Sequence, residues 1–397
     1  MKLKSLLPVG FLLIILLFPT LQINNTTAQI QKVTENTRLR MRDAVVNGMP
    51  YVYEYNNVWA RDTLFSCFGF IADGQYEIVK NLLIFLWNTR YTSEKGDSIS
   101  VIANTTSTRI GEDECIDSTP LWIIITNEYL KANDDVEFKR FMEDERCYEK
   151  LSRWLDSRME NGLVNQRDSD HYYADWCDSA RKGLRPKHVM YSNILFWKAY
   201  TVLDIQKASR LKENIESEFW NGQYYRDFIG SEYLAADGNL LAIVWDFTDR
   251  EQSESILNNM NDMIFPLPTL TVKPRYLHDA ENYQNGRVWG WLGALTIVAY
   301  LKIEDTQNAN RVKNSLVNIL EKENWRFSEL YTEDGSKDGV PFFIWFSGLF
   351  MYALQQFRVA KTDSLIVRGT ILLSSTFSAS VFNPSYSLNL DKQKQPH

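Results

Sequence analysis

Acidic residues occur in four polar clusters of the chain, three of which also contain aromatic residues, and this combination is the first sign of chemistry. The four stretches are VWARD (58–62), DECIDS (113–118), YYADWCD (172–178) and WRFSELY (325–331). Trp and Tyr rings in loops suit stacking on flat ligands such as sugar rings. Two carboxylates on opposite sides of an aromatic-lined site suit glycosidic cleavage, because one acid donates a proton to the leaving oxygen while the other, ionised, acts on water or the anomeric carbon.

Each of these residues also has a structural alternative. Asp62 and Asp117 stand at predicted helix starts, where acids cap free backbone N–H groups. Arg61 could be an ion-pair partner only, and Asp178 and Glu329 could be solvated loop acids. The aromatic neighbours favour a site, since a flanking ring desolvates an acid and raises its pKa. A separation of about 6.5–9.5 Å between the two carboxyl groups would predict inversion, and about 5–5.5 Å retention.

Helical segments of two kinds alternate along the chain. Six are apolar nearly all round, which is typical of helices buried on every side: 63–73, 120–130, 188–203, 238–245, 287–301 and 339–354. Six are amphipathic and charged, which is typical of an outer layer: 32–49, 75–88, 135–159, 204–219, 249–263 and 304–322. The pattern predicts an all-α (α/α)6 toroid of twelve helices, six inner and six outer, in one domain from 32 to 357. An open solenoid is disfavoured because the repeat lengths are irregular.

The connections of this toroid differ at its two ends. Links from inner to outer helices are short, as at Asp73-Gly74 and Leu203-Asp204. Links from outer to inner helices are long, at about 89–118, 160–187, 264–286 and 323–339. Long loops at one end of a rigid scaffold are where function usually lies. All four polar clusters belong to this end.

The two ends of the chain lie outside the helical pattern. Residues 1–28 combine a basic start, an apolar run and a polar segment with small residues, which is typical of a cleaved secretion signal. The alternative is an uncleaved membrane anchor, since the apolar run is near the lower length limit for a span. We expect an exported protein. Residues 358–397 predict a loosely ordered tail without chemistry.

Composition narrows the partners and cofactors. The net charge of -7 argues against nucleic acid or an anionic membrane as partner. Cys67, Cys115, Cys147 and Cys177 permit disulfides in an exported chain, but their spacing fits no zinc pattern. We expect a monomer with a carbohydrate partner, and neither metal nor organic cofactor.

Five segments, in order across about 53–357, resemble (α/α)6-barrel glycoside hydrolases. They are VWARDTLF (58–65), CIDSTPLWII (115–124), DWCDS with RPK and SNILFWKAY (175–200), GRVWGWLGAL (286–295), and SELYTEDG with FFIWFSGLFMYAL (328–354). The chain is most similar to the amylo-α-1,6-glucosidase region of glycogen-debranching enzymes. Neutral invertases and glucoamylase-like enzymes are more distant relatives.

The resemblance implies an inverting mechanism with Asp178 as general acid and Glu329 as general base. It further implies that Arg61, Asp62 and Asp117 bind substrate. We expect Trp176 to hold the glycone with them, and Trp59 and Trp289 to form aromatic walls. Asp175 directly precedes Trp176 and is the alternative candidate for the general acid. Asp178 is preferred as the general acid because it occupies the position of the Asp in the family motif. We include Asp175 among the substrate-binding residues.

The chain departs from the family where a Glu thought to contact substrate is replaced near Met190 or Tyr191. This departure leaves the sugar and the linkage open. The sequence predicts an exported inverting hydrolase of an α-glucosidic linkage, similar to debranching enzymes. The alternatives are a non-catalytic carbohydrate-binding relative, a polysaccharide lyase and an isoprenoid cyclase.

Overall fold

The computed structural model describes residues 29–52, 57–99, 102–103, 115–166, 175–177, 180–181, 184, 186–277 and 283–360. The chain divides into two compact units, Met1–Gln355 and Gln356–His397. Of the second unit, only the helical residues 356–360 are described. The expected secretion signal (1–28) lies outside the described residues, as does nearly all of the expected tail (358–397). No helix in the described ranges is long and apolar enough to cross a membrane.

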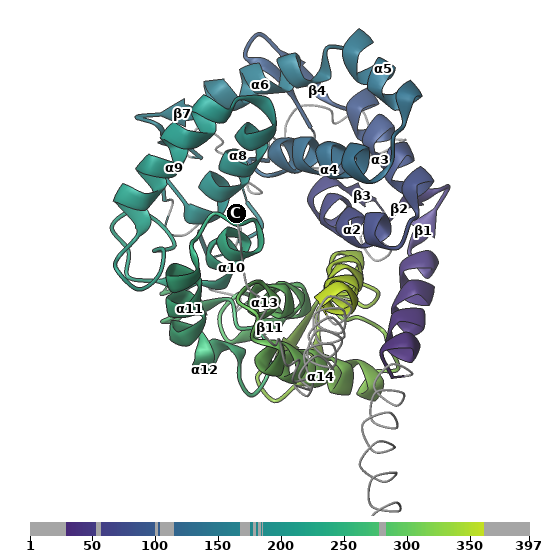
Figure 1. Cartoon of the computed structure of the whole chain (residues 1–397), viewed down its shortest axis with the longest axis vertical. Coiled ribbons are helices and arrows are strands. Elements are labelled where there is room, and N and C mark those ends of the chain that lie inside the picture. The colour runs from purple at the N-terminus through teal and green to yellow at the C-terminus, as the bar shows by residue number, and fades with distance from the viewer. Residues whose placement is uncertain are drawn as a thin grey trace, which may run out of the picture. The chain divides into compact units, whose positions relative to one another are not determined.

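The first unit consists of inner and outer helices that alternate along the chain (Figure 1). The inner helices are α2 (Ala60–Ala72), α4 (Ser118–Ala132), α8 (Met190–Leu203), α10 (Ala236–Val244), α13 (Gly290–Lys302) and the helix that begins at 344, whose residues up to 355 belong to this unit. The outer helices are the helix 29–43, α3 (Tyr76–Asn88), α5 (Val136–Asp144), α6 (Cys147–Ser157), α9 (Ile205–Phe219), α11 (Arg250–Asn259), α12 (Asn261–Ile264) and α14 (Thr306–Lys322). The predicted all-α toroid is confirmed.

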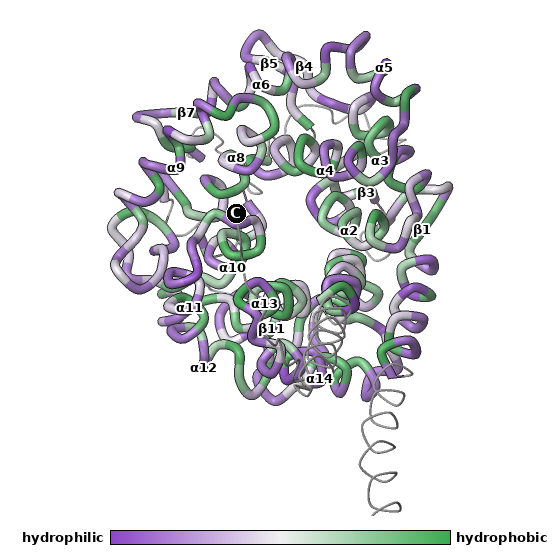
Figure 2. Tube along the Cα trace, in the orientation of Figure 1, coloured by the Kyte–Doolittle hydropathy of each residue, from purple (hydrophilic) through white to green (hydrophobic). Residues whose placement is uncertain are grey.

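The two kinds of helix differ in burial as their sequences require. In α9 the buried positions Ala208, Leu211, Ile215 and Phe219 follow the three-to-four spacing of one helix face. In α8, by contrast, every residue from 190 to 197 is buried. Hydrophilic residues concentrate at the periphery, along α5 and α9 (Figure 2). Apolar periodicity therefore decides which layer each helix joins.

The inner helices of the first unit form a closed ring. Contacts run from α2 to α4, α8, α10 and α13 in chain order. The last inner helix closes the ring, because Trp345 stacks on Trp291 of α13 at 4.3 Å and on Phe65 of α2 at 4.8 Å. It also approaches α2 closely, since a Cβ at Gly69 would lie 2.1 Å from the carbonyl oxygen of Gly348. Only glycine permits this crossing.

Short strands occupy the links between helices. The strands are β1 (Val45–Val46), β2 (Met49–Pro50), β3 (Val58–Trp59), β4 (Tyr91–Ser93), β5 (Gly96–Ser98), β6 (Ile102–Ala103), β7 (Met159–Glu160), β8 (Leu163–Val164), β9 (Leu234–Ala235), β10 (Val272–Lys273), β11 (Arg287–Trp289), β12 (Leu330–Thr332) and β13 (Lys337–Asp338). β11, β12 and β13 form one antiparallel sheet in which Trp289 faces Leu330. This pairing places Glu329, just before β12, beside the start of α13.

Several predicted helices differ from the structure. The outer helix expected over 249–263 is divided into α11 and α12, and the inner helix expected over 339–354 begins only at 344. Two further helices end early or break for a local backbone reason. The first was expected over 32–49, but it ends at 43 and a β1–β2 hairpin follows. Its turn is Asn47-Gly48, and both residues have positive φ, as an Asn-Gly hairpin turn requires. The third outer helix, expected over 135–159, is broken into α5 and α6 at Arg146, which has a φ of 53°. Both breaks are local backbone effects that leave the alternation of layers intact.

Candidate active site

Side-chain caps are present at some outer helices and absent from others, namely α3, α6 and α12, and the starts of the inner helices bear on the acids of the site. Asp side chains cap the outer helices α5, α9, α11 and α14. The inner helices α2, α4, α8, α10 and α13 have no side-chain cap. Asp117 occupies the cap position of α4 but makes no capping hydrogen bond. The capping alternative for Asp117 is therefore wrong.

Asp117 instead holds Arg61. The Nε of Arg61 donates to Oδ2 of Asp117 in a short ion pair, and Nη2 of Arg61 donates to the sulfur of Cys115 at 2.8 Å. Cys115 donates to Oδ1 of Asp117 at 2.6 Å, and the hydroxyl of Tyr191 donates to Oδ2 at 3.1 Å. Arg61 and Asp117 are 7% and 0% exposed. The pair is a rigid buried unit that joins the starts of α2, α4 and α8.

Tyr191 was missed as a site residue, although its position was marked. It stands in the segment where the sequence departs from the family pattern, near the replaced Glu. The Tyr191 hydroxyl donates a hydrogen bond to the Asp117 carboxylate of the Arg61–Asp117 pair. Burial raises the pKa of Tyr191 well above its ordinary value, and Asp117 raises it further. The phenol is therefore a neutral donor.

Asp62 and Glu329 form a second group of buried acids. Asp62 lies in the first turn of α2 and is 7% exposed, and Glu329 is 4% exposed. Burial raises the pKa of Asp62 from 3.8 to about 7, with Arg61 opposing the rise and Glu329 and Asp117 adding to it. Asp62 therefore exchanges its proton near neutral pH. A carboxyl that is neutral part of the time beside a second carboxylate suits acid–base chemistry or donation to a sugar hydroxyl.

The carboxylate of Glu329 accepts hydrogen bonds from Tyr283 and Val340. The hydroxyl of Tyr283 donates to Oε1 in a short hydrogen bond, and the backbone N–H of Val340 donates to Oε2 at 3.3 Å. Gly339 has a φ of 67°, and a Cβ there would lie 2.6 Å from Oε2. Both the conformation and the space at position 339 therefore require glycine. These contacts hold the carboxyl group of Glu329 in one orientation, as a general base requires.

Tyr283 was also missed, and nothing in the sequence around it marks it as a partner of Glu329. The two residues lie 46 positions apart. The Tyr283 ring packs edge-on against Trp289 at 5.2 Å. The β11–β12 pairing brings the segments together, so the contact depends on the tertiary structure alone.

The Trp residues predicted at the site form an aromatic cluster. Trp176 packs edge-on against Trp289 at 5.1 Å and against Trp291 at 4.9 Å, and its Nε1 donates to Oδ2 of Asp237 at 2.6 Å. Trp176 and Trp289 are 3% and 2% exposed, so both rings support the site from within the fold. Trp59 is half-buried in β3, directly before α2. Contact of these rings with a ligand stays a prediction.

Of the two candidate general acids in the YYADWCD stretch, the structure describes Asp175 only. Asp175 is 2% exposed, and its carboxylate accepts from Gln166 at 2.8 Å, from the N–H of Cys177 at 2.7 Å and from Arg181 at 3.3 Å. Both oxygens of Asp175 are thus engaged by donors of the fold, which disfavours Asp175 as the residue that faces the leaving oxygen. Asp178 lies outside the described residues, so its assignment as general acid stays a prediction.

All four cysteines are buried and none of them takes part in a disulfide, so the disulfides that the sequence permits do not form. The described residues contain no group of His, Cys, Asp and Glu that could hold a metal ion. The site assembled by the fold consists of Arg61, Asp62, Asp117, Tyr191, Tyr283 and Glu329, with the Trp cluster behind it.

No protein-family model and no curated protein matches the sequence. Solved structures match the fold. The GH63 mannosylglycerate hydrolase from Thermus thermophilus in complex with glucose has a TM-score of 0.58 at 12% identity, covering 80% of this chain and 98% of that one. The same hydrolase with Tris and D-glycerate has a TM-score of 0.57 at 12% identity, with the same coverage. A structure described as a wild-type glycosidase has a TM-score of 0.61 at 11% identity, covering 83% of this chain and 98% of that one. At such low identity the likeness concerns the fold: this chain has the (α/α)6-barrel fold found in glycoside hydrolases.

Proposed function

We propose that this protein is an inverting glycoside hydrolase. The observation that carries the proposal is the arrangement of Glu329, a buried carboxylate oriented by Tyr283 and Val340 beside Asp62 and the Arg61–Asp117 pair. The fold supports the proposal, since the structures that share it are described as a mannosylglycerate hydrolase and as glycosidases. Neither a lyase nor a cyclase has a comparable observation in its favour.

The proposed reaction is a single displacement. Asp178 donates its proton to the glycosidic oxygen as the bond from that oxygen to the anomeric carbon breaks. Glu329 removes a proton from a water molecule whose oxygen attacks the anomeric carbon from the opposite face. The leaving group departs with the proton of Asp178, and the sugar is released with inverted configuration. Arg61 and Asp62 hold the sugar hydroxyls, Asp117 fixes Arg61 from within the fold, and Trp176 supports the site from behind.

The proposed substrate class is an α-glucosidic linkage in an oligo- or polysaccharide, as in debranching enzymes. This finer proposal rests on the five sequence segments and on the mixed donors and acceptors of the site, which suit a neutral polyol. Two structures that share the fold are described as complexes with glucose. Mannosylglycerate, the substrate in the name of one of them, is the comparison compound for the test.

The test incubates the purified full chain with maltose, isomaltose, trehalose, sucrose, glycogen limit dextrin and mannosylglycerate. Proton NMR of the released sugar gives its anomeric form before mutarotation. We expect an α-glucoside to be hydrolysed to β-glucose. If mannosylglycerate alone is hydrolysed, the proposal of a glycoside hydrolase stands and the proposed α-glucosidic specificity is overturned. If α-glucose is the first product, the proposed inverting mechanism is overturned.

The catalytic assignments are tested by Asp178→Asn and Glu329→Gln. Each is expected to lower kcat by about 10²–10⁴-fold while the protein stays folded, the usual contribution of a general acid or base. The matched control is Glu333→Gln, a loop acid four positions from Glu329 whose side chain is 54% exposed and pairs with Arg275. Near wild-type turnover in either variant would remove that residue from the mechanism. A folded wild type that binds sugars without turnover would make the protein a carbohydrate-binding relative.

We also propose that residues 1–28 direct export and that the enzyme acts as a monomer. Both proposals rest on the sequence alone. N-terminal sequencing of the protein from the producing cells tests the first, with a start near residue 29 expected. Light scattering of the purified enzyme tests the second, and a dimer mass would contradict it.

A further inference from the structure

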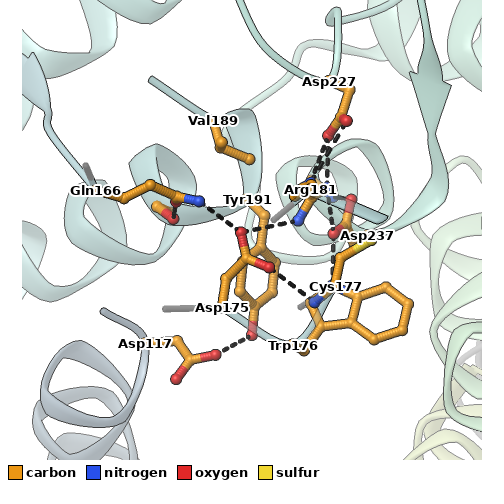
Figure 3. Close-up of polar contacts among 12 residues, drawn as sticks. Asp117, Gln166, Asp175, Trp176, Cys177, Arg181, Val189, Tyr191, Asp227 and Asp237 are labelled. Atoms are coloured by element: carbon orange, nitrogen blue, oxygen red, sulfur yellow. Dashed lines mark hydrogen bonds and ion pairs between the residues drawn. The ribbon is translucent and has the colours of Figure 1, made fainter. Parts of the chain in front are cut away.

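A buried cation surrounded by three acids lies next to the proposed site. We call Arg181, Asp175, Asp227 and Asp237 the Arg181 cluster (Figure 3). The guanidinium contacts Asp227 at 2.5 Å, Asp237 at 2.8 Å and Asp175 at 3.3 Å. All four residues are at most 2% exposed. The sequence marks Asp175 alone among them.

The three acids come from three different parts of the fold. Asp175 belongs to the link between β8 and α8. The backbone carbonyl of Asp227, in the link between α9 and α10, accepts from the N–H of Met190 at the start of α8 at 2.8 Å. Asp237 lies in the first turn of α10, where its Oδ1 accepts from the N–H of Gly238 at 2.7 Å. Arg181 thus ties one loop to the starts of two inner helices.

The turn held by this cluster runs from Asp175 to Cys177. The carboxylate of Asp175 accepts from the N–H of Cys177, which closes the turn. The indole N–H of Trp176 donates to Asp237, which is itself paired with Arg181. Every residue of the turn is therefore connected to Arg181 by at most one intermediate group. The next residue in the chain is Asp178.

Stability does not explain the cluster. Buried ion pairs are often replaced by packed apolar residues with neutral or favourable effect, by about 1–4 kcal/mol, because desolvation costs exceed the attraction. Here three carboxylates face one guanidinium. Burial raises the pKa of Asp227, against the pull of Arg181 and with a further rise from Asp237. Such a costly arrangement is better explained by the geometry that it imposes.

A second connection joins the cluster to the sugar-binding pair. The guanidinium of Arg181 lies over the ring of Tyr191 at 6.0 Å from its centre. The hydroxyl of the same Tyr191 donates to Asp117, which holds Arg61. A displacement of Arg181 would thus shift both the turn Asp175–Cys177 and, through Tyr191, the Arg61–Asp117 pair.

We propose that Arg181 is a positioning residue that fixes the turn Asp175–Trp176–Cys177 and so serves the proton donation assigned to Asp178. The inference rests on the proposed function. Arg181 itself stays away from the substrate. Lys carries the charge but lacks the planar fork that contacts three carboxylates at once, so it substitutes only in part.

The experiment compares two substrates of the sugar that the wild type hydrolyses. One is an alkyl glycoside, whose poor leaving group requires a proton. The other is the glycosyl fluoride, which departs as a weakly basic anion and gains little from proton donation. Arg181→Gln is expected to lower kcat on the alkyl glycoside by about 100-fold and on the fluoride by less than about 10-fold, given the usual size of general-acid catalysis. Arg181→Lys should fall between Arg181→Gln and wild type.

A second, less disruptive variant tests the proposal in case Arg181→Gln does not fold. Tyr276→Phe removes one hydroxyl that donates to Asp227 at 2.7 Å and should show the same substrate preference with a smaller loss. The control is Arg90→Gln, which removes a part-buried guanidinium that pairs with Asp97 at 2.7 Å in the outer region. It should affect both substrates equally or not at all.

The outcomes separate the two proposals. A selective loss on the alkyl glycoside supports positioning. Equal losses on both substrates in Arg181→Gln and Tyr276→Phe, or no loss on either, overturn it while the hydrolase function stands. A wild type that cleaves neither substrate for any sugar tested overturns the hydrolase function, and the positioning inference falls with it.

Discussion

Asp62 should make the stability of the folded protein depend on pH, and Asp62→Asn should remove that dependence. The carboxyl is buried beside Arg61, Glu329 and Asp117, and its pKa is raised to about 7. Asn has nearly the same shape and does not ionise. The comparison therefore isolates the ionisation of one side chain.

The magnitude follows from the shift in pKa. An acid whose pKa is higher in the folded chain than in the unfolded chain binds its proton more tightly when folded. Its contribution to stability is full below the unfolded value of 3.8 and is lost as pH rises towards about 7. Each pKa unit corresponds to 1.36 kcal/mol, so the full loss is about 4 kcal/mol. About 3 kcal/mol of this falls between about pH 5 and about pH 8.

The assay is urea unfolding of wild type and Asp62→Asn across this pH range, followed by Trp fluorescence. We expect the free energy of unfolding of the wild type to fall by about 3 kcal/mol relative to the variant as pH rises. Asp246→Asn is the control, because that side chain is 72% exposed and pairs with Lys302 at the surface. Its pH dependence should match the wild type. A constant difference between wild type and Asp62→Asn would refute the reasoning.

Three further predictions follow from single contacts. Tyr283→Phe removes a donor to the carboxylate of Glu329 and should lower kcat by about 10- to 100-fold, the usual range for a hydrogen bond to a charged group, and an unchanged kcat would contradict the contact. Gly69→Ala places a Cβ 2.1 Å from the carbonyl of Gly348 and should lower the free energy of unfolding by about 1–3 kcal/mol in urea, whereas unchanged stability would argue against the close crossing. Because none of the four cysteines takes part in a disulfide, reducing agent should leave Tm unchanged, and a drop in Tm would reveal a disulfide.

Local sequence pattern accounts for the two layers of helices. A helix with one apolar face joins the outer layer, and a helix apolar all round joins the inner one. The sequence pattern alone therefore assigns α8 to the inner layer and α9 to the outer layer. The same pattern placed Arg61, Asp62, Asp117 and Glu329 on one set of links. It misplaced the end of the first helix, because an Asn-Gly turn after residue 46 overrides helical periodicity.

The partners of the site residues were decided by the tertiary structure. Arg181 and Asp227 are 46 positions apart, and Trp176 and Asp237 are 61 apart. No periodicity links such positions, because the ring closure alone brings their loops together. Asp175 shows the consequence: its neighbours in sequence suggested a catalytic or binding acid, and its neighbours in space make it an anchor for Arg181. The sequence by itself determined which residues could do chemistry, and the closed ring decided which of them face one another, since hydrogen bonds depend on distance in space.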